Sequence, residues 1–241
     1  MGKLTRRGVL GASTSVLGLA ACNREPIFEP EARITVSPDD RPAYPGTANF
    51  IHGVASGDPM PDSVIIWTRV TPDAAYPNLP VPVSYGVFLD AEMEQPVKYG
   101  QGFAIPERDY TVKVSLTELE PDTVYYFRFI ARATSGDVSS PTGRTKTTAA
   151  SGETPVKFAV ISCSNYPFGY FHVYRDIANT PELDAVIHLG DYLYEYGING
   201  YGGDVGQALD RNHEPPLEIV TLDDYRTRHA QYKTDPDLQA A

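Results

Sequence analysis

The hydrophobic positions of residues 46–148 fall in short runs that turn-forming residues separate. Apolar and β-branched residues recur, often in alternation with polar ones, at 63–70, 81–89, 111–116 and 124–133. Several strands at this spacing predict an all-β sandwich. Trp67, the sole tryptophan of the chain, lies in the first run, where we expect it to anchor the core.

The segment LEPDTVY at 119–125 strengthens the prediction of a sandwich. It matches the tyrosine corner of fibronectin-type-III-like domains, in which a tyrosine hydroxyl bonds back to the backbone just before a strand. Tyr125 would supply that hydroxyl. A generic β domain without this topology is the alternative. We interpret His52 as a structural histidine of the same domain.

Residues 154–241 follow a different pattern, in which nearly continuous apolar runs replace alternation. The runs VKFAVIS at 156–162 and LDAVIHL at 183–189 are typical of strands that are covered on both faces. A helical pattern lies between them, at 170–179. Together they predict a βαβ unit with parallel strands and a right-handed crossover. The loops after parallel strands meet at one end of a sheet, where ligands bind.

Three side chains with anionic forms follow these strands. Cys163 comes after the first strand, Asp191 after the second, and Tyr194 three residues further on. A thiolate, a carboxylate and a phenolate together suit a ferric ion. Such an ion lowers the pKa of bound water, which yields a hydroxide nucleophile, and it polarises a phosphoryl oxygen. The pattern therefore indicates metal-assisted hydrolysis.

Other interpretations of these residues stay open. Cys163 could be a structural buried thiol. A catalytic cysteine of a phosphatase would need an arginine six positions later, where this chain has Gly169. We interpret His188 as a core histidine that is satisfied by its neighbours.

The glycine-rich stretch 199–216 lacks the G-K-[ST] signature of a P-loop and is interpreted as a surface loop. Within it, Arg211 and His213 are candidate substrate-binding residues. The sequence TLDD at 221–224 resembles a capping box and predicts a helix that ends near residue 233.

Charge and cysteine content narrow the function classes. The 241 residues include 20 basic and 31 acidic side chains, for a net charge of -11. This excess of acid argues against nucleic acid as a partner. A phosphorylated substrate remains possible because bound cations invert the charge of a site. With only Cys22 and Cys163, the chain cannot build a disulfide framework.

Residues 1–22, MGKLTRRGVLGASTSVLGLAAC, resemble an export signal. The pair Arg6-Arg7 before a mild apolar run indicates the twin-arginine export machinery, with an ordinary secretory signal as the alternative. Leu-Ala-Ala-Cys at 19–22 looks like a lipobox that would lipidate Cys22, and simple cleavage nearby is the alternative. We expect a periplasmic or cell-surface protein, lipid-anchored if Cys22 is modified. Residues 23–45 read as an extended tether.

Four segments closely resemble the alkaline phosphatase D (PhoD-like) family of metallophosphoesterases, from about residue 49 onward. They are FIHGVASGDPMPDSVIIWTRVTP at 50–72, KFAVISCSNYPFGYFHVYRDIA at 157–178, AVIHLGDYLYEYG at 185–197, and TLDDYRTRHAQYKTDPDLQAA at 221–241. The resemblance implies an Ig/fibronectin-III-like β-sandwich at 46–148. It also implies that 154–241 begins a metallophosphatase α/β (αββα) sandwich.

The same resemblance implies the chemistry of the site. Cys163, Asp191 and Tyr194 correspond to iron ligands of the family, and Asp191 would bridge to a second metal, for which calcium (Ca2+) is the expected companion of Fe3+. The implied activity is that of an alkaline phosphatase or phosphodiesterase, which hydrolyses phosphate mono- and diesters by a metal-activated hydroxide.

The chain departs from the family in its length. The phosphatase domain of the family continues past the point reached here, to a WDDHE motif with further metal ligands. Asp235-Pro236 resembles a helix start, yet only five residues follow Pro236. We therefore expect a truncated and inactive chain, with a small natural paralogue as the alternative. The alternative function is that of a surface-tethered, non-enzymatic β-sandwich that serves as a binding or spacer module.

Overall fold

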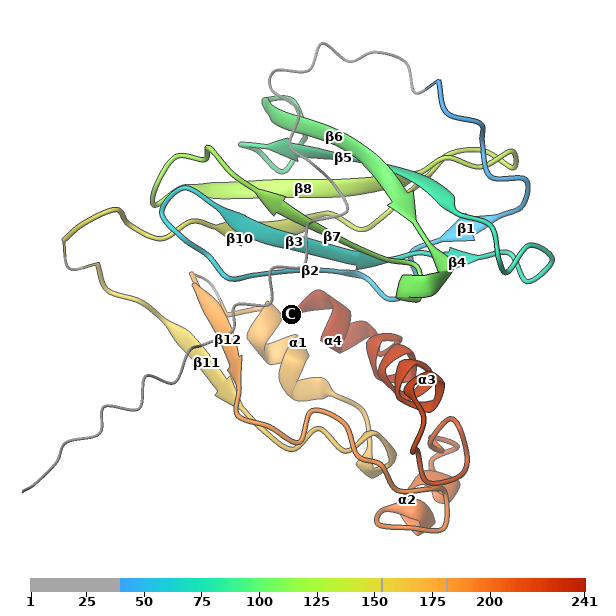
Figure 1. Cartoon of the computed structure of the whole chain (residues 1–241). Coiled ribbons are helices and arrows are strands. Elements are labelled where there is room, and N and C mark those ends of the chain that lie inside the picture. The colour runs from blue at the N-terminus through green and yellow to red at the C-terminus, as the bar shows by residue number, and fades with distance from the viewer. Residues whose placement is uncertain (1–39, 153, 181) are drawn as a thin grey trace, which may run out of the picture.

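Figure 1 shows the computed structural model of the chain, in which a β-sandwich lies above a smaller part built from helices and two strands. The structure describes residues 40–152, 154–180 and 182–241. The predicted signal segment with Cys22 lies outside the described residues, as does the predicted tether up to residue 39. None of the described helices is long and apolar enough to cross a membrane.

Two antiparallel sheets make up the sandwich. The first has the order β2-β3-β7, and the second has the order β10-β8-β5-β6, with β9 paired to β8. A separate pair, β1 and β4, lies at the side. The bounds are β1 (Ala48–Asn49), β2 (Val54–Gly57), β3 (Val64–Arg69), β4 (Thr71–Pro72), β5 (Val81–Phe88), β6 (Pro96–Ala104), β7 (Thr111–Leu116), β8 (Val124–Ala131), β9 (Val138–Ser139) and β10 (Gly143–Lys146). The four predicted runs are strands, as expected: β3, β5, β7 and β8.

The core of the sandwich follows from the alternation of side chains along each strand. Val64, Ile66 and Thr68 of β3 are buried, and the residues between them are only half-buried. Trp67 therefore lies on the outer face of β3, and its prediction as a core anchor is wrong. Its ring meets the His229 ring of a helix outside the sandwich, at 6.5 Å between centroids.

The tyrosine corner is present as predicted. The Tyr125 hydroxyl is buried and accepts a hydrogen bond of 2.8 Å from the backbone N–H of Glu120. His52 is also buried, with its ring against Arg69 and Thr71. Burial, and then the charge of Arg69, lowers the pKa of His52 to about 4, so this ring is neutral at pH 7.

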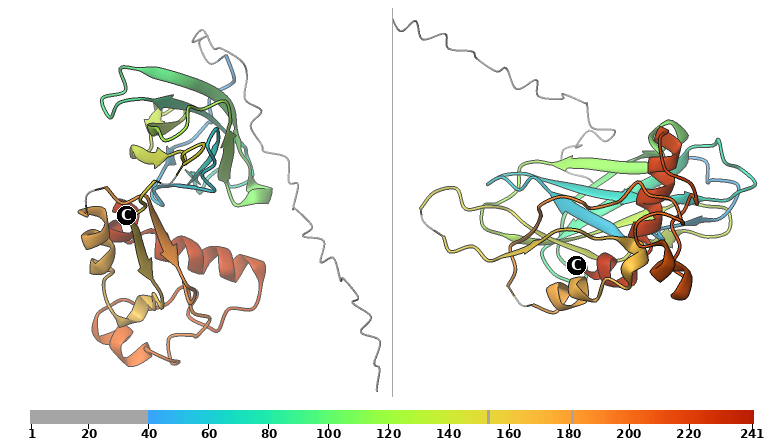
Figure 2. Two further views of the ribbon diagram at one scale, coloured as in Figure 1. Left: turned by 90° about the vertical axis from the view of Figure 1, so that its left-hand side faces the viewer. Right: turned by 90° about the horizontal axis from the view of Figure 1, so that it is seen from below.

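The smaller part contains the predicted βαβ unit. β11 (Phe158–Ile161) and β12 (Ala185–His188) pair in parallel, and α1 (His172–Ala178) lies between them in sequence. The other elements are two 3-10 turns, η1 (Pro106–Arg108) of the sandwich and η2 (Tyr166–Phe168), and the helices α2 (Gly203–Ala208), α3 (Leu222–Lys233) and α4 (Pro236–Ala240). Figure 2 shows α3 lying crosswise beneath the sandwich.

The helix starts largely follow the predicted signals. Thr221 and Asp224 form the capping box of α3, each side chain bonded to the backbone of the other residue. The Asp235 side chain accepts hydrogen bonds from the first turn of α4. Helix α2 was not predicted and occupies part of the expected surface loop 199–216. Two of its six residues are glycine, which removes the apolar periodicity that predicts a helix.

The two strands are not covered on both faces, which corrects the sequence-based expectation for the described part of the chain. Ala159 and Ile161 pack against a small core formed by α1, α3 and α4. Phe158 and Val160 point the other way and are 48% and 57% exposed. An apolar run in the sequence does not show whether a strand is packed against other elements on both faces or on one face only.

A buried arginine organises the irregular segment between β12 and α3. Arg228 of α3 is fully buried, and no carboxylate pairs with it among the described residues. Its guanidinium instead donates hydrogen bonds to backbone carbonyls of Tyr194, Tyr196, Glu214, Pro215 and Leu217. Buried carbonyls of an irregular segment need donors that secondary structure does not supply, and one side chain provides them here.

We expect Tyr125→Phe to lower the free energy of unfolding by about 1 kcal/mol, because the Glu120 N–H loses its acceptor. Urea denaturation of the whole chain measures the change. Tyr126→Phe is the matched control, because Tyr126 is half-buried and no described residue bonds to its hydroxyl. Equal effects of the two substitutions would contradict a tyrosine corner.

We expect Arg228→Met to destabilise the chain by about 3 kcal/mol or more, because it leaves several buried carbonyls without a donor. The same denaturation experiment applies. Arg175→Met removes a half-exposed arginine whose ion pair with Asp237 is 3.9 Å long, and should cost less than about 1 kcal/mol. A loss below 1 kcal/mol at Arg228 would show that the carbonyls find other partners.

Candidate metal centre

The two loops that follow β11 and β12 are held together by backbone hydrogen bonds. Beyond the paired strands, the N–H of Leu189 donates to the carbonyl of Ile161 at 2.8 Å. The Cys163 N–H then donates to Gly190 at 3.1 Å, and the Ser164 N–H donates to Asp191 at 2.9 Å. The parallel pairing thus continues past the strand ends and brings the residues at 163 and 191 side by side.

Both residues have an unusual backbone. Cys163 has a φ of 62° and Asp191 a φ of 51°, in the left-handed region that non-glycine residues seldom occupy. Gly190, between β12 and Asp191, has a φ of 122°. Left-handed residues are costly and tend to cluster where a site requires them. Here they turn the chain sharply, immediately after each strand.

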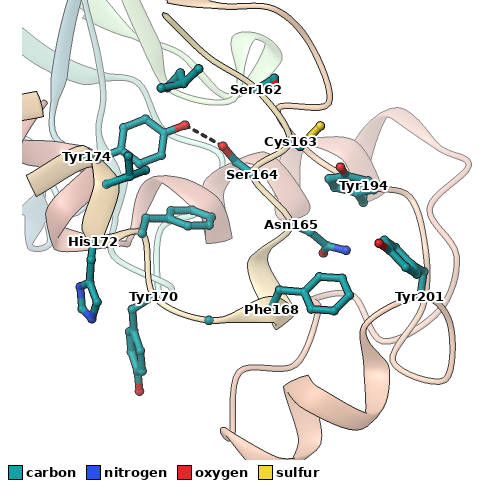
Figure 3. A pocket seen from close by; sticks show the side chains of 14 residues that line it. Ser162, Cys163, Ser164, Asn165, Phe168, Tyr170, His172, Tyr174, Tyr194 and Tyr201 are labelled. Carbon is teal, nitrogen blue, oxygen red and sulfur yellow. Dashed lines mark hydrogen bonds between the residues drawn. The ribbon is translucent and has the colours of Figure 1, made fainter. Parts of the chain in front are cut away.

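The three predicted side chains converge on one oxygen atom. Asp191 Oδ2 accepts the Cys163 thiol with an Sγ to oxygen distance of 3.7 Å, and the Tyr194 hydroxyl at 3.3 Å. Figure 3 shows Cys163 and Tyr194 side by side. The structure therefore brings together the three residues that the sequence singled out. In the described ranges, no three His, Cys, Asp or Glu side chains lie together in a way that could hold a metal ion, and this cluster contains two side chains of those types together with a tyrosine.

The electrostatics of this group favour a cation. Burial, the Cys163 thiol and the Asp191 carboxylate all raise the pKa of the Tyr194 phenol. The neighbouring thiol and carboxylate therefore disfavour the phenolate form of Tyr194. A bound metal ion reverses that relation and stabilises their ionised forms. The donor set is compatible with iron, which cysteine thiolates and tyrosine phenolates both bind in proteins.

A cavity of about 540 Å³ opens beside Cys163 and Tyr194. Phe168, Tyr170 and Tyr201 give it aromatic walls. No lysine or arginine is among its lining residues in the part of the chain that the structure describes. An anionic ligand in this cavity would therefore depend on cations that are themselves bound at the site.

Asn165 is a residue of this site whose role the sequence did not reveal. Its side chain lies in the lining of the cavity, is only 7% exposed, and has no partner for its amide nitrogen or oxygen among the described residues. A buried carboxamide without partners is rare and calls for a ligand. The sequence offered two signals for it: its position two residues after Cys163, and its place within the segment at 157–178 that resembles the family.

Ser164 and His188 form a hydrogen-bonded group behind the candidate ligands. The Gly190 N–H donates to His188 Nδ1 at 3.2 Å, so the proton of the neutral ring lies on Nε2 and points to Ser164 Oγ at 3.1 Å. Ser164 Oγ also contacts the Tyr174 hydroxyl at 2.7 Å. Both ring nitrogens of His188 thus have partners within the protein, which agrees with its interpretation as a satisfied histidine.

Arg211 and His213 do not line the cavity. Arg211 is buried, pairs with Asp235 at 2.6 Å, and stacks on the Tyr166 ring at 3.6 Å from its centroid. His213 is buried and bonds to the carbonyl of Tyr196. Burial and the Arg228 charge lower its pKa to about 4. Both residues have structural partners here, and their binding of substrate stays a prediction.

Comparison with known proteins agrees with the resemblance stated above. Residues 35–149 match the family described as PhoD-like phosphatase, N-terminal domain, and residues 158–241 match the PhoD-like phosphatase family. Alkaline phosphatase D of Bacillus subtilis (strain 168) is 41% identical over 231 residues, which are 93% of this chain and 37% of that protein.

A solved structure described as the structure of PhoD superimposes with a TM-score of 0.70 at 42% identity. The match covers 82% of this chain and 37% of that chain. The chain thus spans a little over a third of the length of the relatives that it matches. Since both of its parts match, in order, the two parts of one family, the chain belongs to the PhoD-like phosphatases.

Proposed function

We propose that this chain is the metal-holding, N-terminal portion of an alkaline phosphatase D-like phosphoesterase that hydrolyses phosphate mono- or diesters. The observation that carries the proposal is the convergence of Cys163 and Tyr194 on one oxygen of Asp191, at the ends of two parallel strands. In this proposal, β11, α1 and β12 begin the α/β sandwich of a metallophosphatase. The activity is proposed for the whole protein, since the matched span is 37% of the relative.

In this proposal Cys163, Asp191 and Tyr194 hold Fe3+. The exposed carboxylate of Asp191 can reach a second cation, and Ca2+ suits a site of oxygen ligands. When bound, the metals would supply the positive charge that lowers the pKa of water and polarises a phosphoryl oxygen. We expect the 241-residue chain alone to turn over substrate poorly, because three donors do not complete the coordination of two ions.

The chain's own residues would bind and orient the ester. In this proposal the Asn165 amide nitrogen, which is buried and has no partner in the described residues, would donate to a phosphoryl oxygen. Phe168 and Tyr201, whose ring centroids lie 5.0 Å apart, form a wall against which an organic group can pack. Arg228 holds the backbone at Tyr194 and so fixes the position of the phenol.

We also propose that the protein is exported, to the periplasm or the cell surface. The basic and apolar pattern of residues 1–22 supports this, with Arg6-Arg7 as the signal for the twin-arginine machinery and Cys22 as the lipidated residue. Membrane fractionation of cells that make the natural protein or its Cys22→Ala variant would distinguish a lipid anchor from release.

We expect the chain to bind one ferric ion, with visible absorption from charge transfer between sulfur or phenolate and iron. Cys163→Ser and Tyr194→Phe should each weaken iron binding by about tenfold or more, and each should alter that absorption. Tyr196→Phe is the matched control, since this neighbour is not part of the cluster. Iron content and spectrum unchanged in both variants would refute the ligand assignment.

We expect Asn165→Ala to weaken binding of inorganic phosphate to the iron-loaded protein by about tenfold, the effect of one lost hydrogen bond of about 1.4 kcal/mol. Calorimetric titration measures the affinity, and iron content is measured in the same samples. Asn199→Ala, at an exposed position of the segment after Tyr196, serves as the control. Undiminished phosphate affinity with full iron content would remove Asn165 from the site.

A further inference from the structure

A second cavity, of about 520 Å³, lies between the sandwich and α3, on a face that the candidate metal centre does not use. Trp67 and Arg69 of β3 line one side, and Tyr225 and Lys233 of α3 line the other. The Arg226 guanidinium donates to the carbonyl of Glu107 at 3.0 Å, which ties α3 to the sandwich beside this cleft. None of its lining residues is shared with the cavity beside Cys163.

The charge of this cleft is opposite to that of the chain. Its cationic lining residues are Arg69, Arg108, Arg226 and Lys233, and its only carboxylate among the described lining residues is Asp109. The chain as a whole carries a net charge of -11. A local excess of positive charge on an acidic protein points to an anionic ligand.

Two of these four cations are already neutralised. Arg69 makes a two-pronged pair with Asp109, at 2.9 and 2.7 Å. Arg226 pairs with Asp223 at 3.3 Å. Within the described residues, no carboxylate lies in ion-pair contact with Arg108 or Lys233. These two cations are therefore available to a bound anion.

Lys233 is the more unusual of the two. The residue is half-buried, and its ammonium lies 5.8 Å from the centre of the Trp67 ring and 5.9 Å from that of Tyr192. Burial lowers the pKa of Lys233, and no charged group among the described residues raises it again. The two rings offset part of the cost of removing the charge from water, but they do not neutralise it.

The remaining walls are apolar or aromatic. Trp67, Leu193, Leu222 and Tyr225 border the same space. Cavities of a few hundred Å³ with apolar walls and a few placed polar groups are typical small-molecule sites. An inorganic anion would bind to the cations but would make no contact with these apolar walls.

We propose that the cleft between β3 and α3 binds a small organic anion with a flat apolar body, which packs on Trp67 and Tyr225 while the unpaired charges of Arg108 and Lys233 attract its acidic group. This site does not depend on the proposed phosphoesterase function. The argument is one of complementarity: two cations without a carboxylate partner and several apolar or aromatic side chains line the same cleft.

The sole tryptophan of the chain makes the test direct, because Trp67 lines the cleft. The probe is naphthalene-2-sulfonate, titrated into the metal-free chain while tryptophan fluorescence is followed. Naphthalene-2-methanol carries the same body without the charge, and sodium sulfate carries the charge without the body. We expect saturable quenching by the sulfonate, and at least tenfold weaker binding of the other two compounds.

Arg108→Met and Lys233→Met should each weaken binding of the sulfonate by about fivefold or more, and together by more than tenfold. Arg175→Met, at an arginine of α1 that does not line the cleft, is the control and should change nothing. Arg108 is exposed, so its variant tests the proposal even if the one at Lys233 does not fold, which circular dichroism checks. Equal binding of the neutral compound, unaltered affinity in the Arg108 variant, or no saturable quenching would overturn the proposal.

Discussion

The backbone pairing of β11 with β12, extended by the bonds from Cys163 to Gly190 and from Ser164 to Asp191, is the interaction on which the candidate site depends. Residues 163 and 191 are 28 positions apart in the chain, and no side-chain contact would bring them together as firmly. A shift of one residue in the pairing would turn every following side chain to the opposite face. The register of two short strands is thus also what places a thiol beside a carboxylate.

A second constraint acts from further along the chain. Tyr194 is three residues beyond Asp191 but belongs to a segment without regular structure, so its own sequence does not hold it in place. Arg228, on α3, supplies donors to the carbonyls of that segment. The candidate metal centre therefore relies on α3 although no residue of α3 belongs to it. In the same helix, Lys233 and Tyr225 border the cleft beneath the sandwich, so one element serves both cavities.

The parts of the fold that could be predicted are those governed by local patterns. The alternation of apolar and polar residues predicted the positions of β3, β5, β7 and β8. The seven residues at 119–125 were enough to predict the tyrosine corner. The convergence of Cys163, Asp191 and Tyr194 could be predicted because parallel strands end at a common edge, a rule that requires no side-chain detail.

The parts that could not be predicted depend on partners that are distant in sequence. Trp67 follows the alternation of β3, but only the presence of α3 explains an aromatic side chain on the outer face. The burial of Asn165 and of Arg228 arises from packing between distant segments, and the residues next to them in the sequence do not predict it. Arg211 shows the same limit: its sequence context in a glycine-rich stretch suggested a ligand, and it could not reveal the ion pair with Asp235, 24 positions away.

The uncovered side of β11 has a consequence for handling the molecule. Phe158 and Val160 place bulky apolar groups in water on a strand with a free edge in the described sheet. Such a surface pairs readily with copies of itself. At high concentration the 241-residue chain should therefore self-associate and precipitate. Dilution, mild detergent or a segment that covers this strand should keep it monodisperse.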